Sequence, residues 1–443
     1  MTDNAPRFVD EDAPIPPIIR GEVLPRARPQ PKAEAPRFAW LRVFAGVDVY
    51  LLATVGLLLA ISLMMVYSTT FDWGYRDFNN PAYFLIRHAQ MMGLGLAAMT
   101  FFALLDYRLL RRVALPMLLV VIGALTAVLL FGDDVFNARR SLIGGRFQPG
   151  EAAQLVTVIY MAAWLSGKRT QVRSITYGLI PFAVLIGLIG GLVLLQPDLS
   201  TTAIVFVTAG MMFFLAGARL THLLVAGAGV SVAGVLFVQQ LIYAQNRVAV
   251  YFSGLQDITQ THPHVQQSML AIIRGGWFGV GLGAGRQKFG YLPAPHTDSI
   301  FASIGEELGL FGAGLVLLLY AVFVFRGVMI AYRSKDSFGS LLASGVTILV
   351  VSQALLNIAV MTATVPPTGV PLPLISYGGS SMTALLAGIG IMLSVSRVAA
   401  KQTSPSSERR SQRANTHRSG RDGRPRVSRS GRRGSSPNAL PRQ

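Results

Sequence analysis

Cysteine is absent from all 443 residues, which excludes disulfide bonds, thiolate metal ligands and a cysteine nucleophile. The sequence also lacks a His-Glu-x-x-His zinc motif and a Gly-x-Ser-x-Gly nucleophile elbow, so zinc hydrolysis and serine-hydrolase chemistry have no support. No short apolar core follows a basic start in the first 40 residues, so we expect no cleavable signal peptide.

Charged residues are scarce as well. They make up 14% of the chain, against 52% hydrophobic residues, and the mean hydropathy is +0.49. This composition is too apolar for a soluble protein of this length. Apolar runs long enough to cross a bilayer recur along the chain, without the alternation of a β-barrel. We therefore predict an all-α, polytopic membrane protein with about ten transmembrane helices, at 49–68, 89–105, 113–131, 152–166, 175–195, 201–217, 221–242, 300–325, 339–363 and 382–397.

Acidic residues are about half as frequent as basic ones, 21 against 39, and the basic residues are unevenly placed. Thirty Lys and Arg lie on the two termini and the short connectors, whereas nine lie on the longer loops at 69–88, 132–151 and 243–299. By the positive-inside rule, we expect both termini in the cytoplasm and the longer loops outside. A large extracytoplasmic loop, 243–299, would then precede the eighth span.

The two ends differ in composition from the apolar middle. Residues 1–46 are rich in proline and charge, and residues 398–443 are rich in Ser, Gly, Pro and Arg. Neither can bury enough apolar surface to offset the entropy of folding, so we predict disordered cytoplasmic segments on either side of a membrane domain at 47–397. A basic tail beside a membrane span favours contact with anionic membrane lipids, and we expect no nucleic-acid partner.

Glycine recurs in the long loop, at six positions from Gly275 to Gly285. No parallel strand or α/β unit surrounds these glycines, so a nucleotide-binding loop lacks its required context. We interpret the segment as a tight turn pressed against other backbone. Just before it, spaced apolar residues from Val265 to Ile273 predict a short interfacial helix.

Polar residues gather at the mouth of the eighth span, within 291–309. Asp298 directly precedes the apolar run that starts at Ile300, so its carboxylate is either a helix cap or a general base. Glu306 and Glu307 lie about two turns into the span, and two adjacent carboxylates cannot both face lipid. We expect at least one of them to face a polar interior and to pair with an arginine.

The positive-inside rule disfavours basic side chains on extracytoplasmic loops. The basic residues found on the outward loops therefore indicate an anionic ligand. Arginine forks suit phosphate oxygens, and cations around a diphosphate would stabilise it as a leaving group. The alternative is that each cation meets a lipid headgroup or a nearby acid. The candidate diphosphate contacts are Arg139, Arg140, Arg146, Arg247 and Lys288.

Two acids on these loops have a structural interpretation. Asp198 precedes a Ser/Thr-rich apolar run, which favours a helix cap. We place Glu151, which ends the second outward loop, in the same class of cap or polar-interior residues. Farther along, proline and glycine crowd the segment 365–381, and irregular backbone at membrane depth is tolerated where it lines a cavity. That segment should form a re-entrant wall of the site.

Three motifs occur in order along the apolar domain: Gln196-Pro-Asp-Leu; Tyr291-Leu-Pro, His296-Thr-Asp-Ser-Ile-Phe and Gly305-Glu-Glu-Leu-Gly; and Pro367-Thr-Gly-Val-Pro-Leu-Pro with Ser376-Tyr-Gly-Gly-Ser-Ser. With them, residues 47–397 resemble the SEDS family of shape, elongation, division and sporulation proteins, the group that contains FtsW and RodA. The motif Ile304-Gly-Glu-Glu resembles the FtsW division branch of the family more than the elongation branch.

The resemblance implies a peptidoglycan glycosyltransferase that polymerises lipid II, an undecaprenyl diphosphate-linked precursor, during cell division or shape maintenance. The reaction would take place at the outer face of the bacterial cytoplasmic (inner) membrane. A class B penicillin-binding transpeptidase and other proteins of a division or elongation complex would be the partners. No metal-ligand residues are predicted and no cofactor is assigned, with a divalent cation such as Mg or Mn left as an option.

The resemblance also assigns residues. Asp298 matches the family's essential loop aspartate, which favours the general base over the cap, since a sugar hydroxyl must lose a proton as it attacks an anomeric carbon. Apart from the resemblance, we predict substrate contacts from polar residues of the outward loops and of the Pro/Gly-rich segment: Gln267, His296, Thr297, Ser376 and Tyr377.

Departures from the family pattern leave two other functions open. Ser141 stands where the family has a tryptophan, and Gln154 stands where it has a lysine. Gly290 and Ala294 replace two acids of the long loop. These losses make a catalytically weakened scaffold that regulates a class B transpeptidase a real alternative. Ten spans with an interrupted segment also suit a flippase or transporter of the lipid-linked precursor, although no inverted repeat is evident.

Overall fold

The computed structural model describes residues 46–135, 138–141, 148–167, 171–240, 242–257 and 261–403. The disordered extension and tail predicted at 1–46 and 398–443 lie almost wholly outside the described residues. All described residues belong to the compact unit Phe44–Gln443.

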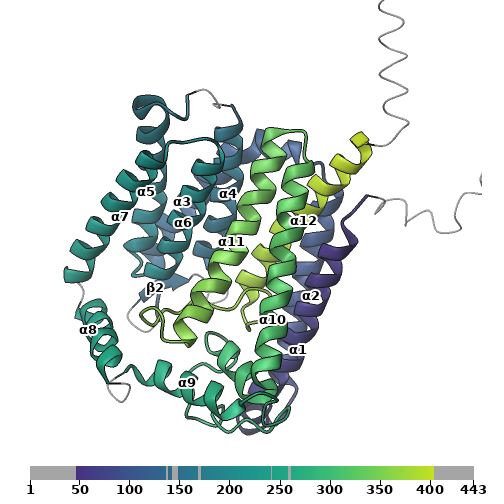
Figure 1. Cartoon of the computed structure of the whole chain (residues 1–443), viewed down its shortest axis with the longest axis vertical. Helices are drawn as coiled ribbons and strands as arrows, with labels where there is room; N and C mark the ends of the chain where they lie inside the picture. Colours follow the sequence, from purple (N-terminus) through teal and green to yellow (C-terminus); the bar gives the residue numbers. More distant parts are fainter. Residues whose placement is uncertain are drawn as a thin grey trace, which may run out of the picture. The chain divides into compact units, whose positions relative to one another are not determined.

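The regular secondary structure of the described residues is helical apart from one short hairpin (Figure 1). The hairpin pairs β1 (Asp133–Val135) with β2 (Ala138–Ser141) in antiparallel register. The helices are α1 (Val49–Phe78), α2 (Tyr83–Leu104), α3 (Arg108–Phe131), α4 (Pro149–Gly167), the π-helix η2 (Ile175–Leu179) that leads into α5 (Ile180–Leu194), α6 (Leu199–Leu215), α7 (Leu220–Gln240), α8 (Ile242–Gln256), α9 (Pro263–Gly275), α10 (Ile300–Arg333), α11 (Ser337–Met361) and α12 (Gly379–Thr403).

The all-α membrane architecture predicted from the sequence is confirmed. Each of the ten expected spans coincides with a helix, and six helices of the described chain are long and apolar enough to cross a membrane. These six are Val49–Phe78, Arg108–Phe131, Ile175–Leu194, Ile300–Arg333, Ser337–Met361 and Gly379–Gln402. The number of spans remains a prediction.

Two expected loops are largely helical, which corrects the prediction. The loop 69–88 shrinks to the residues between Phe78 and Tyr83, because α1 continues past its apolar core and ends only at Asn79, whose backbone is left-handed. The loop 243–299 contains both α8 and α9, and the interfacial helix expected at 265–273 is α9. Polar residues end an apolar run without ending a helix, because helical backbone bonds form equally well outside the membrane.

The later helices pack together around a buried core. Helices α10, α11 and α12 lie side by side in Figure 1, and α12 also packs along α2. Close approach in the second pair requires small residues, since a Cβ added at Gly390 would lie 2.3 Å from the carbonyl oxygen of Met99.

Helix α10 is broken at Gly309, where φ is 69°. The carbonyl groups of Glu306 and Glu307 accept from Val280 and Gly281 N–H at 3.0 and 3.1 Å, instead of from the following turn of α10. In exchange, Leu310 and Phe311 donate to the carbonyl groups of residues 276 and 277, at 2.9 and 3.2 Å. The glycine-rich segment is therefore inserted between two turns of α10.

Glycine is required where this segment meets α10. A Cβ at Gly275 would lie 1.8 Å from the Gly305 carbonyl oxygen, and one at Gly279 would lie 2.2 Å from the Glu307 carbonyl oxygen. Real Cβ atoms do not approach that closely, so glycine permits backbone to lie on backbone. This agrees with the interpretation of the segment as a turn pressed against other chain.

Candidate active site

A cavity of about 240 Å³ lies where α4, α6 and α11 meet the loop before α10 and the Pro/Gly-rich segment before α12. Three carboxylates line it, Glu151, Asp198 and Asp298, together with the amides of Gln148, Gln154 and Gln353. Hydroxyl groups of Thr297, Tyr377 and Ser381 complete its polar wall. The structure thus brings together acids that lie on three separate outward segments of the sequence.

Backbone contacts hold Asp298 in this wall. Asn357 on α11 donates through its amide nitrogen to the carbonyl oxygens of Asp298 and Val370, each at 2.7 Å. Oδ2 of Asp298 lies 3.3 Å from the position a Cβ would take at Gly369. The N-cap residue of α10 is Ser299, so Asp298 is not the cap of this helix.

Helix α9 supports the same loop from outside. His264 Nε2 lies 2.5 Å from Ser299 Oγ, and that hydroxyl donates to the Pro293 carbonyl oxygen at 2.6 Å. Burial, and then the nearby His262 and Arg247, lower the pKa of His264 to about 4, so its ring is neutral at physiological pH. The helix expected at the membrane interface therefore anchors the residue that follows Asp298.

The predicted substrate residues Thr297, Ser376 and Tyr377 join the two loops. Buried Ser376 donates from Oγ to the Thr297 carbonyl oxygen at 2.6 Å and accepts from Leu372 N–H at 2.8 Å. Tyr377 donates its N–H to the His296 carbonyl oxygen at 2.8 Å. Thr297 and Tyr377 line the cavity. Ser376 does not line it, and its hydroxyl group already bonds to two backbone groups, which does not favour the predicted substrate contact through that hydroxyl.

His296 lies beside the cavity, in an aromatic cluster. Its ring centroid is 5.1 Å from that of Trp73 and 5.6 Å from that of Tyr377. Burial lowers the pKa of His296 to about 4, which keeps the ring neutral. Its Nδ1 atom is buried and has no hydrogen-bond partner in the described chain, and the ring does not line the cavity.

Asp198 and Glu151 combine structural and cavity positions. Asp198 caps α6 by accepting from Thr201 N–H at 3.1 Å and from the Thr201 hydroxyl at 2.9 Å, while also lining the cavity. Glu151 lies in the first turn of α4, just before the expected span. Burial, and then the negative charge of Asp198, raise the pKa of Glu151 from 4.5 to about 7.

The raised pKa of Glu151 predicts a pH-dependent stability. The folded state holds this proton more tightly than the unfolded state, so the stabilisation is complete below pH 4.5 and is lost as pH rises through about 7. The lowered pKa values of His264 and His296 make stability rise with pH up to about 6.5, and they do so equally in wild type and in Glu151→Gln. Relative to Glu151→Gln, the wild type should therefore lose stability in detergent between pH 5 and pH 8, by about 2–3 kcal/mol at most. Melting curves of wild type and Glu151→Gln with the same pH dependence would contradict the assignment.

Two functional candidates were not found from the sequence. Asn357 and Gln353 lie within an apolar run of α11 and carry no motif signal. Their spacing of four residues places both on one helix face, which is the signal that was available. Gln353 donates to Gln154 across the cavity wall, so the position where the family has lysine is occupied by a neutral amide pair.

Lys288 was predicted to contact a diphosphate, and the structure places it elsewhere. It is buried, pairs with Glu307 at 2.7 Å and donates to Ser68 Oγ at 3.0 Å. Its charge is therefore compensated inside the protein and does not face the cavity. The arginine partner expected for Glu306 and Glu307 is also corrected, because a lysine fills that role for Glu307.

Glu306 has a different partner, the backbone of the glycine-rich segment. Its carboxylate accepts from Arg286 N–H at 2.9 Å and from Gln287 N–H at 3.3 Å. Glu307 accepts from Gly283 N–H at 3.0 Å in the same way. The two acids therefore hold the inserted segment in the break of α10, at a distance from the cavity lining.

The remaining predicted contacts are dispersed. Arg247 on α8 donates to the Pro367 carbonyl oxygen at 3.1 Å, and Gln267 is half-buried on α9; neither lines the cavity. Arg139 and Arg140 lie on β2, which packs against α3 and α4, whereas Arg146 lies outside the described residues.

Across the part of the chain that the structure describes, no three His, Cys, Asp or Glu lie close enough together to hold an ion. The arrangement offers a carboxylate base in a polar cavity, with a second carboxyl group whose raised pKa favours its protonated form.

Comparison with known proteins agrees with this architecture. A family model for FtsW, RodA and SpoVE, described as "Cell cycle protein", matches residues 49–401. Stage V sporulation protein E of Bacillus subtilis is 37% identical over 355 residues, covering 79% of this chain and 97% of the relative. A protein of Trichlorobacter lovleyi named "Probable peptidoglycan glycosyltransferase FtsW" is 35% identical over 356 residues, covering 80% and 93%.

Solved structures share the fold. A chain from a structure described as "Structural coordination of polymerization and crosslinking by a peptidoglycan synthase complex" matches with a TM-score of 0.66 and 27% identity, over 80% of this chain and 98% of that one. The rod shape determining protein RodA of Thermus thermophilus matches with a TM-score of 0.60 and 28% identity, over 79% and 97%.

Proposed function

The chain belongs to the FtsW/RodA/SpoVE family of cell cycle proteins, and from this premise we propose that the cavity around Asp298 is the active site of a peptidoglycan glycosyltransferase. The chain is an integral membrane protein with that activity, which is named in relatives about 35% identical over most of its length. The observation that carries the assignment of the site is Asp298, whose backbone carbonyl group accepts from Asn357 and which lines a cavity together with two further acids.

The proposed reaction is the transfer of a glycan from a polyprenyl diphosphate to a sugar hydroxyl. A bond forms between the acceptor oxygen and the anomeric carbon, and the bond from that carbon to the diphosphate breaks. Asp298 accepts the proton of the acceptor hydroxyl, as a general base within hydrogen-bond reach. Glu151 shares the cavity, and its raised pKa favours the protonated carboxyl group, which can donate a hydrogen bond to the substrate.

Positively charged side chains must stabilise the departing diphosphate, and the structure reduces the number of candidates for this role. Lys288 is unavailable because Glu307 compensates it. Arg139, Arg140 and Arg146, which lie between α3 and α4 in the sequence, and Arg247 on α8 remain the proposed contacts. Cations near a departing oxygen stabilise the charge that develops in the transition state. A divalent cation such as Mg or Mn, if bound with the diphosphate, would stabilise the same developing charge.

Substrate, partner and orientation belong to the same proposal. The substrate is lipid II, and the partner is a class B penicillin-binding transpeptidase of a division, elongation or sporulation complex. The match to a chain of a peptidoglycan synthase complex supports a partner of that kind. The distribution of Lys and Arg supports a cavity on the outer face of the cytoplasmic membrane, with both termini inside.

The experiment that tests the proposal supplies lipid II to the purified protein, alone and with its transpeptidase, and separates the products by gel electrophoresis. Glycan polymer is the expected result. Well-folded wild-type protein that binds the transpeptidase and makes no polymer would favour the scaffold alternative. Transfer of labelled lipid across vesicles without polymer would favour the flippase.

Asn357 is expected to position Asp298. Replacing Asn357 by Leu keeps the side-chain volume similar but removes the donor to two buried carbonyl groups. We expect the turnover rate for lipid II to fall about 10- to 100-fold, with a smaller change in KM, because a displaced base acts mainly in the transition state. The melting temperature should also fall modestly, since each orphaned carbonyl group costs about 1–3 kcal/mol.

The kinetic split distinguishes positioning from packing. Ser352→Ala, on the same helix, removes a hydroxyl that bonds only to its own helix and should leave the turnover rate unchanged. Equal losses in kcat for the two variants, or a loss in Asn357→Leu that follows protein unfolding alone, would contradict the positioning role.

A further inference from the structure

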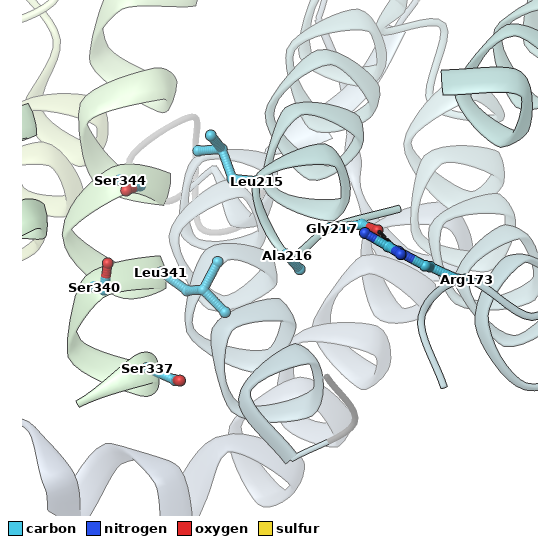
Figure 2. Close-up of a pocket in the computed structure, with 8 residues that line it drawn as sticks. All are labelled: Arg173, Leu215, Ala216, Gly217, Ser337, Ser340, Leu341 and Ser344. Carbon is cyan, nitrogen blue, oxygen red and sulfur yellow. Dashed lines mark hydrogen bonds between the residues drawn. The ribbon is translucent and has the colours of Figure 1, made fainter. Parts of the chain in front are cut away.

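A second cavity, of about 610 Å³, lies at the opposite end of α6 and α11 from Asp298 (Figure 2). We call it the Arg173 cavity. It begins where α6 ends, about 20 Å along that helix from Thr201. Its residues adjoin the connectors around 171–174 and 216–219, which we predict to be cytoplasmic. The glycosyltransferase reaction makes no use of it.

One wall of the Arg173 cavity is cationic. Arg173 donates through Nε to the Gly217 carbonyl oxygen at 3.3 Å, and this bond holds the guanidinium group against the end of α6. The same side chain forms no ion pair within the described part of the chain, and no carboxylate lines the cavity. The terminal N–H groups of the guanidinium therefore keep their capacity for an anion.

The facing wall carries three hydroxyl groups. Ser337, Ser340 and Ser344 follow one another at helical spacing on α11 and line the cavity together. Serine in an apolar helix usually bonds back to its own backbone. None of these three hydroxyls has a hydrogen-bond partner among the residues that the structure describes, so each stays open to a bound group.

The combination selects a ligand chemistry. A guanidinium fork and neutral hydroxyl donors without any acid suit the oxygens of a phosphate group. Leu215 and Leu341 supply apolar surface between the two polar walls, and the volume falls in the range of small-ligand pockets. Basic pockets between membrane helices on the cytoplasmic side are typical sites for phospholipid headgroups.

We propose that the Arg173 cavity binds a phosphate ester, with Arg173 as the charged donor and the serines of α11 as hydroxyl donors. The ester is either the headgroup of an anionic phospholipid or a soluble phosphate ester, and the two share the same recognition. This site is separate from the proposed active site and does not depend on the proposed function.

The test uses the full chain in nanodiscs and in detergent. One arm titrates phosphatidylglycerol into phosphatidylcholine nanodiscs and counts retained lipid by native mass spectrometry. The other arm measures protection from thermal unfolding by glycerol 3-phosphate. Arg173→Gln should weaken binding about tenfold or more, since bonds to charged groups are the strong ones. Arg219→Gln is the matched control, because Arg219 is exposed at the same end of α6 but does not line the cavity.

The outcomes distinguish a phospholipid headgroup from a soluble phosphate ester, and both from the absence of binding. An Arg173-dependent loss in the lipid arm identifies a headgroup, and one in the phosphate arm identifies a soluble ester. If Arg173→Gln folds poorly, Ser340→Ala with Ser344→Ala should still weaken binding about threefold while keeping the charge. Equal binding by Arg173→Gln and Arg219→Gln, or no binding of either probe, would overturn the proposal.

Discussion

Replacing Asp298 by Ala is expected to reduce glycan polymerisation from lipid II at least 100-fold. The carboxylate faces a cavity of about 240 Å³, and its loop is fixed by Asn357 on one side and by Ser299 and His264 on the other. Loss of a positioned general base typically costs a factor of about 10² to 10⁴. The rate is measured as polymer formed per unit time by purified protein with its transpeptidase.

Controls distinguish loss of chemistry from loss of structure. Asp298→Asn keeps the shape of the side chain and should be nearly as inactive, because an amide cannot accept the proton. Asp77→Ala removes an exposed acid at the end of α1 and should retain wild-type activity. Melting temperatures within a few degrees of wild type are expected for all three variants. Substantial polymerisation by a folded Asp298→Ala protein would remove Asp298 from the catalytic role.

Replacing Lys288 by Met is expected to destabilise the protein strongly. The change leaves Glu307 buried beside Ser68, without the cation that lies 2.7 Å away in the wild type. Breaking a buried ion pair by removing one partner costs about 3–5 kcal/mol. The same carboxylate holds the glycine-rich segment through Gly283, so the break in α10 should loosen with it. The loss is measured as a lower melting temperature in detergent.

The double replacement and an exposed pair make this prediction specific. Lys288→Met combined with Glu307→Gln removes both charges and should recover much of the lost stability. Arg76→Met breaks the exposed pair with Asp72 and should cost less than about 1 kcal/mol. If Lys288→Met keeps full stability and loses only turnover, the lysine acts on the diphosphate, as the sequence suggested, and the structural role is wrong.

Features that depend on local composition were predictable. Spans at 49–68 and 300–325 appear as apolar runs, and the helix near Val265 appears as spaced apolar residues. The glycine-rich segment was correctly expected to press against other backbone, although its partner was not identifiable. Helix ends were less predictable, since α1 continues through polar residues to Phe78. Sequence hydropathy marks where lipid begins, whereas hydrogen bonding decides where a helix ends.

Pairing between distant residues was not predictable. Lys288 and Arg247 look equivalent in sequence, as basic residues on one loop, yet only the packing of the loop on α10 places Lys288 against Glu307. Asn357 is one polar residue in an apolar helix, and its role exists only because Asp298 and Val370 fold against it. The effect of the glutamine at position 154 likewise emerges only beside Gln353.

From the sequence alone it follows that this chain is a helical membrane protein, that most of its cations lie on the termini and short connectors, and that Asp298 stands at the mouth of an apolar span. Each of these follows from composition and spacing, which act locally. Tertiary structure alone decided which charges are compensated, because a pKa or an ion pair depends on distances between segments far apart in the chain. The packing of these segments places Asp298 and Glu151 in one cavity. It places Lys288 against Glu307, where the ion pair stabilises the break in α10 and the lysine does not line the cavity.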